Sequence, residues 1–164
     1  MISLAEKQQL LTHLVARLRH EFETLEAAQK ATQAGATHEE AKPENDKDTR
    51  ALEQSYLARG QAARVLQLQA DLAQLAQLRV RSFAPDARIA LTALVELQDD
   101  EGTPKLYMLV PSGAGEELSS SLGPVKVVTP ESPLGRALVG AKLDDDVELS
   151  SPKGKRVISV TGLG

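Results

Sequence analysis

The first half of the chain carries apolar residues in the alternating four-three spacing that is typical of paired helices. In the first stretch these seam residues are Leu4, Leu11, Val15, Leu18, Phe22 and Leu25. From about residue 46 the spacing returns in a second stretch, at Leu52, Tyr56, Val65, Leu68, Leu72 and Leu75. Each stretch is long enough to form a helix of roughly 45–50 Å at 1.5 Å per residue. The pattern predicts two long helices within residues 1–79.

The seam is interrupted between the two stretches. Residues 33–38 carry no seam residue, and Pro43 disfavours helix at the residue before it. A short connection between consecutive helices favours pairing of the two with each other, so we expect an antiparallel coiled-coil hairpin with its tip near residues 36–46. The alternative is that the seam mediates homodimerisation.

After Arg79 the period changes from that of helices to that of strands. Alternating apolar residues predict strands over 88–97, 105–110, 125–128, 146–149 and 156–160, and a loop over the Gly/Ser-rich stretch 112–123. Between them, residues 132–140 resemble a short helix with Ser132 as N-cap, Pro133 at the first position and Gly140 at the end. The fold class is therefore α+β, with a helical hairpin over 1–79 and a small, mostly antiparallel sheet domain over 80–164.

Composition and charge narrow the possible functions. The 164 residues include no Cys and only 2% aromatics, and the net charge is −4. These values argue against a thiolate metal site, a Cys nucleophile and direct electrostatic binding of nucleic acid. No apolar run is long enough for a membrane span and the N-terminus is too polar for a signal peptide, so we expect a cytoplasmic protein with no membrane partner.

The predicted hairpin tip is the one strongly acidic segment. Across ten residues, two lysines stand beside five carboxylates, namely Glu39, Glu40, Glu44, Asp46 and Asp48. Such a segment is commonly a solvated turn, but carboxylates at the end of a rod can also hold Mg²⁺ or orient a water. Elsewhere the sequence contains no nucleotide-binding loop, zinc-protease motif or nucleophile elbow, and His13 and His20 are expected on the helix surface.

The C-terminal half contains a distinctive run of residues. The segment Val127–Gly140 includes Ser-Pro-Leu-Gly-Arg-Ala-Leu and is followed by Asp-Asp-Asp-Val over residues 144–147. In these residues the chain resembles the Gre family of bacterial transcription elongation factors. The resemblance continues at the tip with Glu44 and Asn45. The resemblance implies an FKBP-like fold for the second domain. It also implies a factor that binds RNA polymerase and reaches nucleic acid only through it, by inserting the coiled coil into the secondary channel.

In this family, tip carboxylates help the polymerase hold its second Mg²⁺ and a water, and the polymerase then cleaves backtracked RNA. By this resemblance Glu44 is the metal-assisting residue, with Glu40 or Asp46 as its partner. The implied polymerase contacts are Asn45, Ser132, Pro133, Leu134 and Arg136. The chain itself would be an accessory factor rather than an enzyme, monomeric when free.

The tip departs from the family's D-x-x-E-N pattern, because Ala41 stands where the pattern has Asp. This departure keeps a second hypothesis open, a channel binder that does not promote cleavage and competes with active Gre factors. A prolyl isomerase, the third hypothesis, needs a deep apolar pocket lined with aromatics. The second domain offers only Phe83 and Tyr107 for that purpose.

Overall fold

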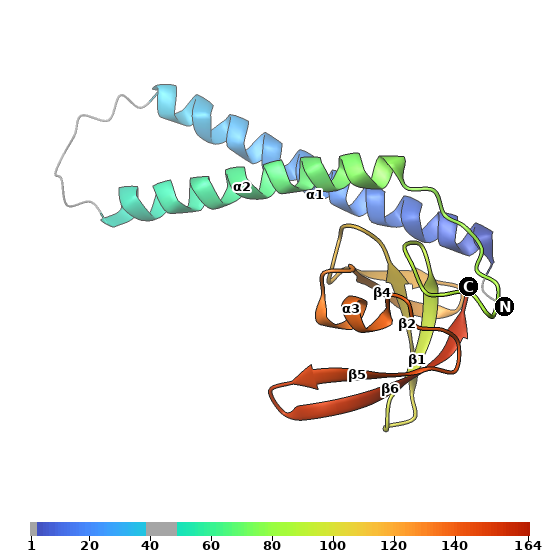
Figure 1. Ribbon diagram of the computed structural model, residues 1–164. Helices are drawn as coiled ribbons and strands as arrows, with labels where there is room; N and C mark the ends of the chain where they lie inside the picture. The colour runs from blue at the N-terminus through green and yellow to red at the C-terminus, as the bar shows by residue number, and fades with distance from the viewer. Residues whose placement is uncertain (1–2, 39–48) are drawn as a thin grey trace.

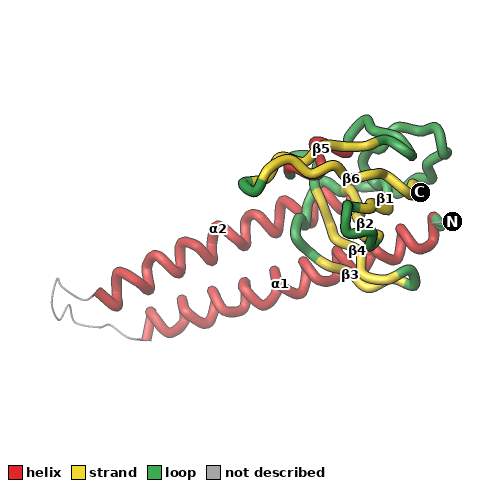
Figure 2. Tube along the Cα trace, turned by 90° about the horizontal axis from the view of Figure 1, so that it is seen from below, coloured by secondary structure: helices red, strands yellow, loops and turns green. Residues whose placement is uncertain are grey.

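The computed structural model describes residues 3–38 and 49–164 of the chain. Two long helices, α1 (Leu4–His38) and α2 (Thr49–Gln77), run antiparallel and lie side by side as an arm (Figures 1 and 2). A reciprocal cap begins α1, since the Glu6 amide donates to Ser3 Oγ and the Ser3 amide donates to the Glu6 carboxylate. Residues 78–164 form the head at one end of this arm. The predicted hairpin is confirmed.

The seam is buried only in the half of the arm nearest the head. Leu11, Leu18, Leu68 and Leu75 are buried, whereas Tyr56 is 63% exposed and Leu52 is 57% exposed. The assignment of Leu52 and Tyr56 to this seam was wrong for a geometric reason. Tyr56 and Val65 are nine residues apart, about two and a half turns, and therefore face opposite sides of α2.

The head is built on one sheet of six strands among the described residues. Their bounds are β1 (Leu94–Gln98), β2 (Pro104–Leu109), β3 (Glu117–Ser120), β4 (Gly123–Val128), β5 (Asp146–Ser151) and β6 (Gly154–Leu163). The strand order is β3-β4-β2-β1-β6-β5, and every neighbouring pair is antiparallel except the parallel pair β2 and β4. The short helix α3 (Pro133–Leu138) follows β4. The α+β class and the mostly antiparallel pairing are confirmed.

Two predictions about strands were wrong. The stretch 112–123 is not all loop, because it contains β3, whose one buried side chain, Leu118, gives no alternating pattern to read. The first strand begins at Leu94 rather than at residue 88, because Thr92 has a φ of 73° and interrupts the extended backbone.

The two faces of the sheet bury two separate apolar clusters. Leu94, Met108 and Val125 on one face pack with Leu10, Leu14 and Leu18 of α1. Val95, Leu109 and Val160 on the other face pack with Leu138 of α3. In Figure 1 the arm crosses above the sheet while α3 lies beside it. Because the first cluster includes side chains of both arm and head, the arm is seated on the sheet rather than tethered by a linker alone.

No helix in the described ranges is long and apolar enough to cross a membrane.

Candidate functional site

The four predicted tip residues lie outside the described part of the chain. Glu40, Glu44, Asn45 and Asp46 fall within residues 39–48, between the end of α1 and the start of α2. Their predicted roles therefore stay predictions. Among the described residues, no group of three His, Asp or Glu side chains is arranged to hold a metal ion, and His13 and His20 are exposed as expected.

The predicted docking segment is placed around α3. Ser132 is the N-cap: its Oγ accepts from the Gly135 amide at 3.0 Å and donates to the Thr129 carbonyl at 2.7 Å. Pro133 occupies the first turn, and Arg136 Nε donates to the Glu131 carbonyl at 2.9 Å. The capping prediction is confirmed. Ser132 and Arg136 both bond to backbone groups within residues 129–135, so at least part of their role is structural.

Two side chains of the docking segment border an apolar pocket. Pro133 is exposed and Leu134 is half-buried against the second cluster. Between α3 and the sheet, a pocket of about 490 Å³ is lined by both of them and by Tyr107, Val128 and Leu149. Pro133 and Leu134 thus lie where a partner's apolar side chain could insert. Sequence reasoning missed the contributions of Tyr107 and Leu149, which only the strand pairing brings to this place.

Residues 84–163 match the family described as "Transcription elongation factor, GreA/GreB, C-term". Over 154 residues the chain is 27% identical to transcription elongation factor GreA of Zymomonas mobilis, covering 93% of this chain and 88% of that protein. The family match groups the head, residues 84–163, with the C-terminal part of GreA and GreB. Over 74 residues it is also 35% identical to the GreA of Sphingopyxis alaskensis, covering 45% of this chain and 43% of that relative's length.

Solved structures similar to this chain include GreA factor homologue 1 (Gfh1). The Gfh1 of Thermus thermophilus matches at 19% identity with a TM-score of 0.37, covering 98% of this chain and 95% of that one. The Gfh1 of Thermus aquaticus matches at 23% identity with a TM-score of 0.38, covering 95% and 94%.

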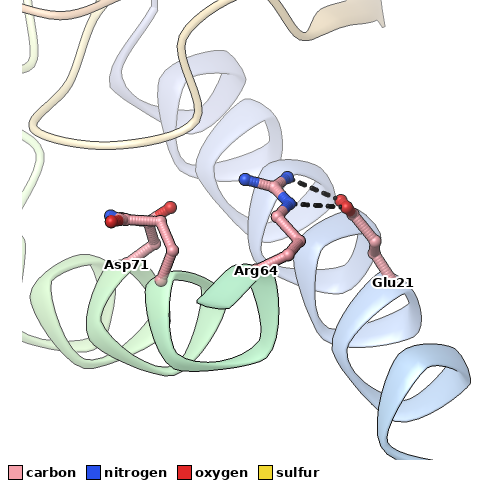
Figure 3. A network of polar contacts seen from close by, with 4 residues as sticks. Glu21, Arg64 and Asp71 are labelled. Carbon is pink, nitrogen blue, oxygen red and sulfur yellow. Dashed lines mark hydrogen bonds and ion pairs between the residues drawn. The ribbon is translucent and has the colours of Figure 1, made fainter. Parts of the chain in front are cut away.

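An ion pair that the sequence pattern did not predict joins the two helices of the arm near the head. Arg64 of α2 donates from Nε and Nη2 to the two oxygens of Glu21 on α1, at 2.8 and 2.9 Å (Figure 3). Two turns further along α2, the buried Asp71 accepts a hydrogen bond from the Gln67 amide group at 2.7 Å. No local signal predicts Glu21 and Arg64 as partners, because the pairing depends on the register of the hairpin.

This pair lies beside a polar crevice between arm and head. The crevice has a volume of about 260 Å³ and is lined by Arg64, Gln67 and Asp71 from α2 and by Ser112, Glu116 and Glu131 from the head. Two of its charged groups have ion-pair partners inside the chain, since Glu116 pairs with Arg17 at 2.9 Å and Arg64 pairs with Glu21. The crevice is therefore a polar joint between arm and head.

We expect the Glu21–Arg64 pair to add only about 0.5 kcal/mol to stability, because both side chains are more than a third exposed. The hydrogen bonds from Arg64 lower the pKa of Glu21. The contribution is therefore present at neutral pH and is lost as the pH falls through that lowered pKa. A double-mutant cycle of Glu21→Gln and Arg64→Met, followed by urea unfolding at low and high salt, measures the coupling. A coupling of several kcal/mol that persists in high salt would contradict this expectation.

Proposed function

We propose that this chain is a Gre-type transcription elongation factor that binds bacterial RNA polymerase and inserts its arm into the secondary channel. The observation that carries the proposal is a two-helix arm that extends well beyond a head whose sequence matches the GreA/GreB C-terminal family (Figure 1). At 1.5 Å per residue, α2 alone is roughly 43 Å long. An arm of that length can bring the segment 39–48 to a place that the head does not reach.

The acidic residues of that segment suit a role beside a metal ion. Carboxylate oxygens are the protein ligands that Mg²⁺ prefers, and two hold a divalent ion better than one. Glu44, together with Glu40 or Asp46, would help the polymerase hold its second Mg²⁺. When bound there, that ion supplies charge stabilisation for phosphodiester hydrolysis and lowers the pKa of a bound water. The covalent chemistry belongs to the polymerase, so the chain is an accessory factor and not itself the enzyme.

The docking surface of this proposal is the rim of the apolar pocket beside α3. Pro133 is exposed at the rim, and Leu134, Tyr107 and Leu149 line the interior. An exposed apolar residue beside a largely apolar pocket with charged residues at its edge, here Glu117 and Lys126, is typical of a protein interface. The arm packs on the opposite face of the sheet from α3. Docking at α3 therefore leaves the arm free to enter a channel.

A second function is favoured by Ala41. This residue replaces the carboxylate of the family's tip pattern, which leaves Glu44 without its usual partner. In this second function, the chain occupies the secondary channel without promoting cleavage and competes with active Gre factors.

Cleavage of backtracked RNA separates the two functions. Stalled, backtracked polymerase complexes are mixed with the protein and Mg²⁺, and RNA length is followed on a gel. We expect the RNA to shorten with the wild type and with Glu23→Ala, an exposed carboxylate on α1 away from the tip, but not with Glu44→Ala. Full-length RNA despite demonstrated binding would exclude cleavage and support the second function.

Binding is measured separately on the same complexes, by fluorescence anisotropy of the labelled protein. Pro133→Asp places a charge at the pocket rim, and because an acidic residue is favourable in the first turn of a helix, the head should still fold. We expect weaker binding by at least tenfold. Pro152→Asp, at an exposed proline in the β5–β6 turn, is the matched control and should bind as the wild type does. Equal loss in both variants would exclude the pocket beside α3 as the docking site.

A further inference from the structure

A buried cation joins the base of the arm to the head. Lys7, at the end of the first turn of α1, is 1% exposed, although lysine is almost never fully buried. Its Nζ donates to the Arg81 carbonyl and lies 4.7 Å from the centre of the Phe83 ring. Arg81 Cζ lies 4.8 Å from the same ring. One aromatic ring thus contacts two cations. The attraction between a cation and the face of a ring is stronger where water is excluded.

The hydrogen bonds continue from Arg81 into the sheet. The Arg81 amide donates to Thr92 Oγ1 at 3.3 Å, and the Thr92 amide donates to the Leu109 carbonyl of β2 at 2.7 Å. Thr92 is 1% exposed and has a φ of 73°, which is strained for a β-branched residue. Such strain persists only where surrounding contacts fix the backbone. These contacts form a continuous connection from α1 to the central part of the sheet, which we name the Lys7 strap (Lys7, Arg81, Phe83 and Thr92).

The apolar contacts between arm and head do not by themselves fix the direction of the arm. Burial of Leu10 and Leu14 of α1 against the sheet is favourable but non-directional. Direction requires at least two fixed points along the helix. Arg17 supplies one, through Glu116 at 2.9 Å and the Glu117 carbonyl at 2.7 Å, but its side chain is 60% exposed and its contribution is small. Lys7, ten residues earlier and buried, supplies the stronger one.

We propose that Lys7 is a positioning residue, and that the Lys7 strap sets the angle at which the arm leaves the head. The distance from Lys7 to His38 along α1 is roughly 46 Å, so a rotation of about 10° at the base moves the far end by roughly 8 Å. Functional groups must be held within about 0.5 Å of their working geometry. The benefit to the tip rests on the proposed function, whereas the fixed angle is a property of the free protein.

The angle is measured on the full chain in solution. Because the chain has no cysteine, Ala27→Cys on α1 and Lys155→Cys on β6, both at exposed positions, provide two spin labels without further changes. Pulsed electron resonance then gives the distance distribution between arm and head. We expect one narrow distribution in the wild type and a distribution at least twice as broad in Lys7→Met, which keeps the length of the side chain but removes the ammonium. Lys30→Met, an exposed lysine on the same helix, is the matched control and should leave the distribution narrow.

Two further changes test the strap without touching Lys7. Phe83→Leu removes the ring, and Thr92→Val removes the hydroxyl, whereas Thr92→Ser retains it. We expect broadening with Phe83→Leu and Thr92→Val and recovery of the narrow distribution with Thr92→Ser. Distributions as narrow as in the wild type for folded Lys7→Met and Phe83→Leu would overturn the proposal.

The cleavage assay adds a separate readout. If the proposed function holds, Lys7→Met should lower the maximal cleavage rate while leaving the half-saturating concentration unchanged, because Lys7 does not line the docking pocket. If the proposed function fails, the distance distributions still decide whether the strap fixes the arm.

Discussion

Gly135→Ala is expected to destabilise the protein by about 3 kcal/mol, which would lower Tm by roughly 6–12 °C. A Cβ at this position would lie 1.9 Å from the Thr129 carbonyl oxygen, a backbone atom that cannot rotate away. The same oxygen accepts hydrogen bonds from the amide and the hydroxyl of Ser132, so moving it also disrupts the cap of α3. Urea unfolding of the two proteins measures the difference.

Gly60→Ala is the matched control for this change. Gly60 lies in α2 with nothing within 4 Å of the position its Cβ would occupy. Alanine has the higher helix propensity, so we expect stabilisation by about 0.5–1 kcal/mol. Because the two substitutions are chemically identical, opposite signs would show that backbone crowding at Thr129 causes the effect. A loss below 1 kcal/mol at Gly135 would mean that the loop before α3 adjusts easily.

The second large effect is a pH dependence that comes from Lys7. Burial, with a smaller contribution from the nearby Arg81 guanidinium, lowers the pKa of Lys7 from 10.5 to about 8. Between these two values the unfolded chain keeps a proton that the folded chain has released. The contribution of Lys7 to the free energy of unfolding therefore rises as the pH rises through this window, by about 2 kcal/mol. Below pH 8 both states hold the proton and this contribution is constant.

Comparison with Lys7→Met isolates this effect. All other titratable groups are the same in both proteins, so the difference between the two unfolding free energies reports Lys7. We expect the free energy of unfolding of the wild type to rise relative to that of Lys7→Met between pH 8 and 10, as measured by urea unfolding. Parallel curves for the two proteins would contradict a lowered pKa for this lysine.

The elements that the sequence predicted well are those specified by local spacing. The four-three seam placed Leu11, Leu18, Leu68 and Leu75 correctly, and the Ser-Pro start of α3 was read from its capping chemistry. The wrong assignments needed information from elsewhere in the fold. Leu118 is an isolated apolar residue whose strand is defined by pairing with β4 and by contact with α1.

The contacts between arm and head were the least predictable part. Lys7 lies three residues after Leu4 and four before Leu11, so a charged residue occupies a position of the apolar seam. This position was the one sequence signal that Lys7 is buried. Its partners could not be read in the same way. Arg81 and Phe83 lie in an irregular segment after α2, and Thr92 approaches them only because the chain turns before β1.

The position of β6 in the sheet has a consequence for synthesis of the chain. β6 is the last described strand in chain order, yet it lies between β1 and β5 and contributes pairing partners to both. The arm can form from local contacts as soon as α2 has been translated, whereas the sheet stays split until β6 has left the ribosome. During that interval Val95 and Leu97 of β1 lack their pairing partners Leu163 and Val160 on β6. Nascent chains stalled before β6 should therefore bind chaperones through the unpaired edge of β1 and the second apolar cluster, to which Val160 belongs in the finished protein.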